Sequence, residues 1–135
     1  MIQETVKLFV ESIDSAFVAS TDENGVPHLA VGHDPTVPDP DHLVFEAWFC
    51  PKTLQNVSRN PRVAVVVVTP DSGAGYQFVG TVEQLATTGI LDGYADTQEE
   101  PPGMPQVQSR LVVRVDQVME FSEGAHTDRP FAARS

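Results

Sequence analysis

The chain has 135 residues, which is typical of one domain large enough to bury a sizeable apolar core. Its 8 basic and 19 acidic side chains give a net charge of −11, which argues against nucleic acid as a partner and favours solubility. The one cysteine, Cys50, excludes a disulfide framework and a cysteine-based zinc cluster. Because neither a signal peptide nor an apolar run of membrane-spanning length is recognisable, we expect a cytoplasmic protein without membrane contact.

The N-terminal third predicts a helix and a β-hairpin. Its first apolar residues recur at helical spacing, and they are Ile2, Val6, Phe9, Val10 and Ile13. Residues 15–21 and 26–33 are predicted strands, and the Asn-Gly pair between them favours a tight turn because it tolerates positive φ. Residues 34–42 contain three prolines and three aspartates, so we expect no regular structure there. A third strand is predicted at residues 43–49.

Residues 50–69 combine a loop, a short helix and a strongly apolar strand. Thr53 is the predicted N-cap, because its hydroxyl can accept from the free amide groups of the first turn. Leu54 and Val57 give the helix one apolar side, and the Asn-Pro pair that follows ends it, since the residue before a proline leaves the helical region. Residues 63–68 are all apolar and mostly valine, which indicates a buried strand.

The start of this helix is a candidate anion site. Free amide groups and the positive end of the helix dipole favour a negative charge there, and Lys52 adds a full positive charge beside the Thr53 hydroxyl. Lys7 and Lys52 are the only lysines among the eight cations, which makes a lysine at this position less expected by chance. An ordinary helix cap next to a solvated lysine is the alternative interpretation of the same pattern.

Two further strands complete the predicted sheet. Residues 76–85 alternate well enough to form a returning strand, and Gly80 inside it indicates a bulge or a close backbone approach. Residues 86–108 lose this pattern, except for a helical spacing shared by Ile90, Leu91 and Tyr94. The proline-rich stretch that follows is predicted to be a surface excursion.

The last predicted strand spans residues 109–121, with Leu111, Val113 and Val115 on one face. Residues 122–135 are predicted to be a C-terminal tail, which leaves residues 1–121 as the domain. Six strands joined by short turns, with only two or three helices, predict a mainly β protein built as a small antiparallel barrel.

Six motifs, taken in this order, carry a resemblance to a known family: FVAST, DENG, VPHLAV, LVFEAW, PKTLQNVSRNPRVAVVV and YQFVGTV. They resemble the FMN-binding split barrel of the pyridoxamine 5′-phosphate oxidase-like proteins, over roughly residues 1–85. The combination of VPHL with KT..NV..NPRV is the specific part. The chain is especially similar to the short, single-domain FMN-binding members. The resemblance therefore implies a six-stranded antiparallel split β-barrel of the FMN-binding type.

The resemblance also implies where the flavin would lie. Lys52 and Thr53 would contact the phosphate of FMN, in agreement with the anion site argued from the helix start. The strand segment that would lie along the flavin consists of Ala30, Val31, Gly32 and His33. The neighbouring segment, which would flank the ribityl chain and the ring, consists of Phe45, Glu46 and Ala47. Proteins of this fold place the cofactor at a two-fold interface, so a homodimer is implied, with a formal charge of twice −11, or −22.

The sequence departs from the family in two places. Gly32-His33 stands where some relatives place a polar residue and an aromatic against the ring. True pyridoxamine 5′-phosphate oxidases continue into a C-terminal stretch whose arginine and histidine hold the substrate phosphate, and here His126 and Arg129 occur in a different order and setting. We therefore expect no oxidation of pyridoxamine phosphate.

Two functional hypotheses follow, and no catalytic side chain is assigned because redox chemistry belongs to the flavin itself. The first is a dimeric FMN flavoprotein with oxidoreductase or electron-transfer activity, with NAD(P)H or a protein as electron donor. The second is a binding or sensing module that holds a flavin, a deazaflavin or haem without turnover. An interaction barrel without any cofactor is a third interpretation.

Metal binding is not indicated by the sequence. His28 and His33 are five positions apart on a predicted strand, so they point to opposite faces. The aspartates of residues 34–42 lack the glycine and the terminal glutamate of a calcium loop. Trp48 is more typical of an apolar core than of a cofactor contact.

Overall fold

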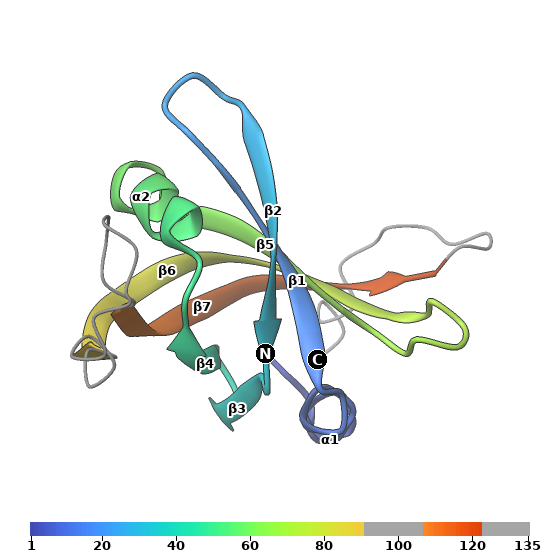
Figure 1. Ribbon diagram of the computed structural model, residues 1–135. Coiled ribbons are helices and arrows are strands. Elements are labelled where there is room, and N and C mark those ends of the chain that lie inside the picture. Colours follow the sequence, from blue (N-terminus) through green and yellow to red (C-terminus); the bar gives the residue numbers. More distant parts are fainter. Residues whose placement is uncertain (91–106, 123–135) are drawn as a thin grey trace.

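Seven strands and two helices make up the part of the chain that the computed structural model describes, residues 1–90 and 107–122 (Figure 1). In chain order, the elements are α1 (Glu4–Glu11), β1 (Ser15–Thr21), β2 (Pro27–His33), β3 (Thr36–Asp39), β4 (His42–Trp48), α2 (Pro51–Arg59), β5 (Arg62–Val68), β6 (Gly75–Ile90) and β7 (Val107–Phe121). The strands form one antiparallel sheet in the order β2-β1-β5-β6-β7-β4-β3. The predicted mainly β, antiparallel class is confirmed, with seven strands in place of six.

The additional strand is β3, and it shows that the prediction of no regular structure in residues 34–42 was wrong. β3 is an edge strand paired with β4, and an edge strand tolerates Pro38 because one of its sides needs no ladder partner. Val37 is buried, and its backbone N–H donates to Glu11 Oε2 of α1 at 2.8 Å. Edge position and the contact to α1 together allow a proline-rich segment to form a strand.

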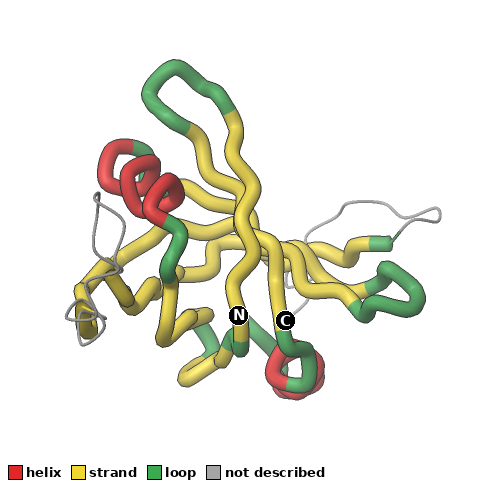
Figure 2. Tube along the Cα trace, in the orientation of Figure 1, coloured by secondary structure: helices red, strands yellow, loops and turns green. Residues whose placement is uncertain are grey.

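The sheet curves until its two ends pack against each other without joining, so the barrel is split (Figure 2). Gly32 on β2 shows how close the ends come. A Cβ atom added at Gly32 would lie 2.3 Å from Cζ3 of Trp48 and 2.9 Å from the ring of Phe45, and both aromatic residues belong to β4. Only glycine leaves room for this aromatic pair, whose ring centroids are 5.2 Å apart in an edge-to-face arrangement.

The long β6–β7 ladder forms the body of the sheet. The predicted irregularity at Gly80 is confirmed, because the register shifts between Val79 and Gly80 and an added Cβ would lie 2.4 Å from the carbonyl oxygen of Arg114. β6 continues to Ile90, so the prediction of a helical segment that begins at Ile90 was wrong at that residue. Leu91, Tyr94, the proline-rich stretch and the tail at residues 123–135 lie outside the described residues.

The two helices lie at different ends of the β1–β2 hairpin (Figure 1). In α1, Val6 and Val10 are buried and Phe9 packs partly buried against the same core, as does Ile13 just after the helix, which confirms the predicted amphipathic helix. α2 lies beside the hairpin near its turn, where Gly25 has a φ of +83°. The predicted core face of β7 is also confirmed, because Leu111, Val113 and Val115 are buried.

Candidate functional site at the start of α2 and along β2

The helix α2 begins earlier than its sequence predicted. Cys50 is the N-cap residue, no side chain caps the first turn, and Pro51 occupies the first helical position. Proline suits that position because its fixed φ is helical and the missing N–H would have no partner there. Thr53 is therefore the third residue of the helix, and the prediction that it is the N-cap was wrong. The helix ends before Asn60-Pro61, as predicted.

Lys52 and Thr53 point to different sides of this first turn. The Lys52 side chain is exposed, whereas Thr53 is fully buried against the sheet. In the described part of the chain, the Thr53 hydroxyl is one of two buried side-chain polar atoms that lack a hydrogen-bond partner. A buried hydroxyl without a partner costs stability, and it lies beside uncapped amide groups at the positive end of a helix. These groups fit an anion that supplies acceptor oxygens.

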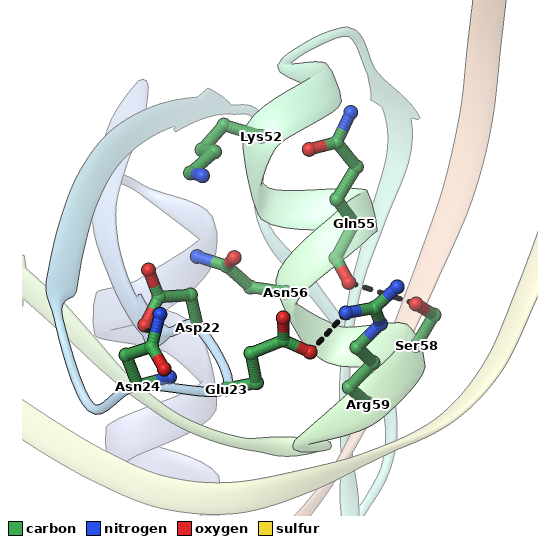
Figure 3. Close-up of a pocket in the computed structure, with 8 residues that line it drawn as sticks. All are labelled: Asp22, Glu23, Asn24, Lys52, Gln55, Asn56, Ser58 and Arg59. Atoms are coloured by element: carbon green, nitrogen blue, oxygen red, sulfur yellow. Dashed lines mark hydrogen bonds and ion pairs between the residues drawn. The ribbon is translucent and has the colours of Figure 1, made fainter.

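Lys52 borders a polar cavity of about 300 Å³ between α2 and the β1–β2 turn (Figure 3). The lining residues are Asp22, Glu23, Asn24, Lys52, Gln55, Asn56, Ser58 and Arg59. Both carboxylates are already engaged: Asp22 accepts from the backbone N–H groups of Asn24 and Val26, and Glu23 pairs with Arg59. The hydrogen bond from Val26, with smaller contributions from Asn24 and the Lys52 charge, lowers the pKa of Asp22. Lys52 itself forms no ion pair among the described salt bridges.

Hydrogen bonds between neutral side chains, one buried and one partly buried, fix α2 on β1. Asn56 Nδ2 donates to Ser20 Oγ at 3.0 Å, and both residues are buried. At the end of the helix, Asn60 Nδ2 donates to Thr21 Oγ1 at 2.8 Å. These contacts join residues 36 and 39 positions apart, so no local sequence pattern could reveal them. They set the position of the first turn of α2 relative to the hairpin.

The β2 segment predicted to lie along a flavin alternates between the two faces of the sheet. Ala30 and Gly32 are buried and face the interior, whereas Val31 and His33 face outward and are exposed. The space on the inner side of Gly32 is filled by Trp48 and Phe45. A ligand along this segment would therefore contact its outward side chains and its backbone.

The β4 segment shows the same alternation. Phe45 is fully buried, Glu46 is exposed and forms an ion pair with Arg110 Nε at 2.9 Å, and Ala47 is half-buried. A second cavity, of about 470 Å³, lies at the ends of the two segments and is lined by His33, Asp34, Thr36, Glu46, Ala47 and Phe49. The structure thus brings His33, Glu46 and Ala47 together, while Lys52 lies in the other cavity.

A charged cluster that links strands β3, β4, β7 and β6 was not found by sequence reasoning. His42 Nδ1 lies 2.8 Å from Asp39 Oδ1, and His42 Nε2 lies 2.8 Å from Glu83 Oε1. Glu83 Oε2 also accepts from Arg114 Nη1 at 3.1 Å. The bonds to Asp39 and then Glu83 raise the pKa of His42, and the bond from His42 lowers the pKa of both carboxyl groups. We call these four residues the His42 cluster; only the short spacing of Asp39 and His42 is visible in the sequence.

No group of three or more histidine, cysteine, aspartate or glutamate side chains is placed to hold a metal ion in the described part of the chain. Among the described helices, none is both long and apolar enough to cross a membrane.

Several solved structures have a fold similar to that of this chain. HupZ of Group A Streptococcus is 23% identical with a TM-score of 0.68, over 94% of this chain and 99% of that chain. An F420 reductase is 21% identical with a TM-score of 0.63, over 87% and 98%. An FMN-binding protein of Syntrophomonas wolfei is 14% identical with a TM-score of 0.65, over 91% and 89%. At these identities the likeness shows the fold.

A comparison with curated protein sequences finds no match. The sequence does match the family described as Pyridoxamine 5'-phosphate oxidase over residues 2–119, which is most of the chain and spans both helices and nearly all of the sheet. The antiparallel split barrel agrees with that match. The chain therefore belongs to the pyridoxamine 5'-phosphate oxidase family.

Proposed function

We propose that this protein is an FMN-binding flavoprotein with oxidoreductase or electron-transfer activity. The observation that carries the proposal is the first turn of α2, where the buried Thr53 hydroxyl has no described partner and the exposed Lys52 has no described ion pair. The family membership and the fold shared with an FMN-binding protein support it. When bound, FMN would supply the hydride and electron chemistry.

Lys52 and Thr53 would hold the phosphate of the cofactor. The backbone N–H groups of the first turn and the Thr53 hydroxyl would donate to phosphate oxygens, and Lys52 would balance the charge. The chain as a whole carries a net charge of −11, so this local concentration of donors and positive charge is what would attract a dianion to the protein.

The isoalloxazine ring would lie at the ends of β2 and β4. The proposed flanking segments are residues 30–33 and 45–47, which meet at the cavity of about 470 Å³. Because Phe45 and the inner side of Gly32 are closed by core packing, the contacts would come from His33, Ala47 and the strand backbones. These groups would position the ring and exclude water from one of its sides.

A second copy of the chain would cover the outer face of β1 and β2. Phe17, Leu29 and Val31 are 42%, 64% and 49% exposed on that face, and Phe17 lies directly opposite Val31 in the ladder. A regular sheet face with large exposed apolar side chains is typical of an interface. Val31 also belongs to the proposed flavin segment, so the interface and the cofactor site would adjoin.

The dimer is tested by light scattering on a Leu29→Glu variant, which we expect to be monomeric while the wild type is dimeric. Leu8→Glu is the matched control, because Leu8 is also an exposed leucine, at 58%, but lies on α1. A monomeric wild type would contradict the homodimer.

We further propose that the protein is cytoplasmic and does not oxidise pyridoxamine phosphate. The alternative function is a binding or sensing module for flavin, deazaflavin or haem without turnover. The shared fold with an F420 reductase favours a deazaflavin as the cofactor in that case. NAD(P)H or a protein partner would be the electron donor only under the first proposal.

The absorbance spectrum of the purified protein, followed by titration with FMN, tests the cofactor. We expect a flavin spectrum or saturable uptake of FMN, and a colourless protein that takes up no FMN would contradict the proposal. Stopped-flow mixing with NADH or NADPH then separates the two functions. Rapid bleaching of bound flavin supports turnover, and its absence with all donors favours the binding module.

A further inference from the structure

His28 on β2 carries the second buried polar atom that lacks a described partner, its Nδ1 atom. Neither the sequence motifs nor the proposed flavin segments assign a role to this residue. In the part of the chain that the structure describes, the two such atoms are His28 Nδ1 and Thr53 Oγ1. Native proteins rarely leave buried donors unpaired, so each of these atoms calls for an explanation.

The two atoms belong to one place in the fold. His28 lies directly opposite Ser20 in the β1–β2 ladder, so the two side chains share the inner face of the hairpin. Ser20 accepts the hydrogen bond from Asn56 on α2. Thr53 precedes Asn56 by three positions on the helix and therefore lies on the same helix face. His28 and Thr53 thus flank the Ser20–Asn56 hydrogen bond, one from the strand and one from the helix.

The chemistry of the two groups matches one kind of ligand. A threonine hydroxyl and the N–H of an imidazole both donate hydrogen bonds, and a phosphate oxygen accepts them without needing a donor in return. The inward-facing positions of β2 continue from Gly32 and Ala30 to His28, so His28 extends the proposed flavin strand to the position opposite Ser20, which Asn56 of α2 contacts.

We propose that His28 is a further phosphate-binding residue, which donates from Nδ1 to the same anion that the Thr53 hydroxyl contacts. The proposal rests on the proposed FMN function and adds to it a contact from β2. An internal water between the two groups is the competing explanation, and the experiment distinguishes the two.

Titration with FMN and with riboflavin, which lacks the phosphate, tests His28 through flavin fluorescence. We expect His28→Leu to weaken FMN binding about tenfold or more and to leave riboflavin binding unchanged, because one donor to a charged group is lost. His28→Gln keeps a donor and is expected to retain most of the FMN affinity. Thr53→Val is the isosteric partner variant, and we expect the double variant to lose less than the product of the two single losses.

Unchanged FMN affinity in His28→Leu would overturn the proposal, and a lowered unfolding temperature of the same variant without ligand would then assign the two atoms to an internal water, whose hydrogen bonds the substitution removes. If the wild type binds no FMN, the proposed function fails by itself. In that case the unfolding temperatures of the wild type and of His28→Leu are measured with and without inorganic phosphate. Stabilisation of the wild type by phosphate that is lost in His28→Leu supports the assignment. Equal stabilisation of both proteins, or of neither, overturns it.

Discussion

The inner side of β2 beneath α2 and the His42 cluster, which links β3 to β4, β7 and β6, are both held by polar contacts, but these contacts differ in burial and charge. Under α2, buried amide and hydroxyl groups of Asn56 and Ser20 pair with each other. In the His42 cluster, an imidazole, two carboxylates and a guanidinium pair near the surface. A buried pair of neutral side chains does not titrate, and salt does not screen it. An exposed pair of charged side chains titrates with pH and is screened by salt. The hydrogen bond between Asn56 and Ser20 should therefore resist changes of pH that weaken the His42 cluster.

The largest effect on the buried region should come from Gly32→Ala. The added methyl group would lie 2.3 Å from Trp48 Cζ3, so the aromatic pair must move, and overpacking of this kind costs about 1–3 kcal/mol of unfolding free energy. Urea denaturation measures the loss. Gly25→Ala is the control, because Gly25 has open space but a φ of +83°, and a cost of about 1 kcal/mol from the backbone alone is expected there. An equal loss in both variants would contradict the close packing at Gly32.

An effect of similar size should follow the loss of the buried hydrogen bond between α2 and β1. Asn56→Leu should destabilise the protein by about 1–3 kcal/mol, because the bond to Ser20 is lost and the hydroxyl is left buried without it. The double variant Asn56→Leu/Ser20→Ala should recover part of this loss, since it removes both polar groups. Additive losses in the double variant would show that the two side chains do not interact.

A smaller, functional effect is expected from Lys52→Gln, which removes the exposed charge beside the first turn of α2. FMN binding should weaken about tenfold, since a contact to a charged phosphate is lost, and riboflavin binding should not change. Lys7→Gln makes the same chemical change on α1, where Lys7 pairs with Glu11, and should leave FMN binding unaltered. Equal weakening by both variants would show a general effect of net charge and would argue against a phosphate contact at Lys52.

The smallest effect, and the one that separates the two regions, concerns pH. The raised pKa of His42 means that its stabilisation is complete below the unfolded imidazole pKa of about 6.5 and is lost as pH rises through the folded value. The lowered pKa values of Asp39 and Glu83 mean that their contribution is lost as pH falls through the folded carboxyl values. The cluster should therefore stabilise the protein most in mildly acidic solution.

His42→Gln should flatten the decline in unfolding free energy between mildly acidic and alkaline pH. His33→Gln serves as the comparison, because it removes an exposed histidine that has no described carboxylate partner. Hydrogen exchange should show faster opening of β3 above the folded pKa of His42, while the backbone of α2 stays protected. Parallel loss of protection in both regions would contradict the distinction between them.

Much of the sheet could be predicted because local patterns mark it. The strands β1, β2, β4 and β5 follow from runs of apolar and β-branched residues separated by turn residues, and the Gly80 irregularity follows from a glycine inside a strand. β3 could not be predicted, because its one proline, Pro38, is acceptable only at a sheet edge, and edge position is a property of the whole sheet. The start of α2 was misplaced because a threonine near the start of a helix can be either the N-cap residue or a residue of the first turn. Pro51 occupies the first helical position, so Thr53 lies within the first turn.

By itself, the sequence determined the antiparallel strands, the short helix after the third predicted strand, and the cation and hydroxyl at its start, because each depends on residues close together in the chain. Tertiary structure alone decided that Lys52 faces solvent while Thr53 is buried, that Trp48 fills the space over Gly32, and that His28 lies opposite Ser20 beneath α2. These facts depend on how a curved sheet brings distant segments together, and neither composition nor periodicity encodes that curvature.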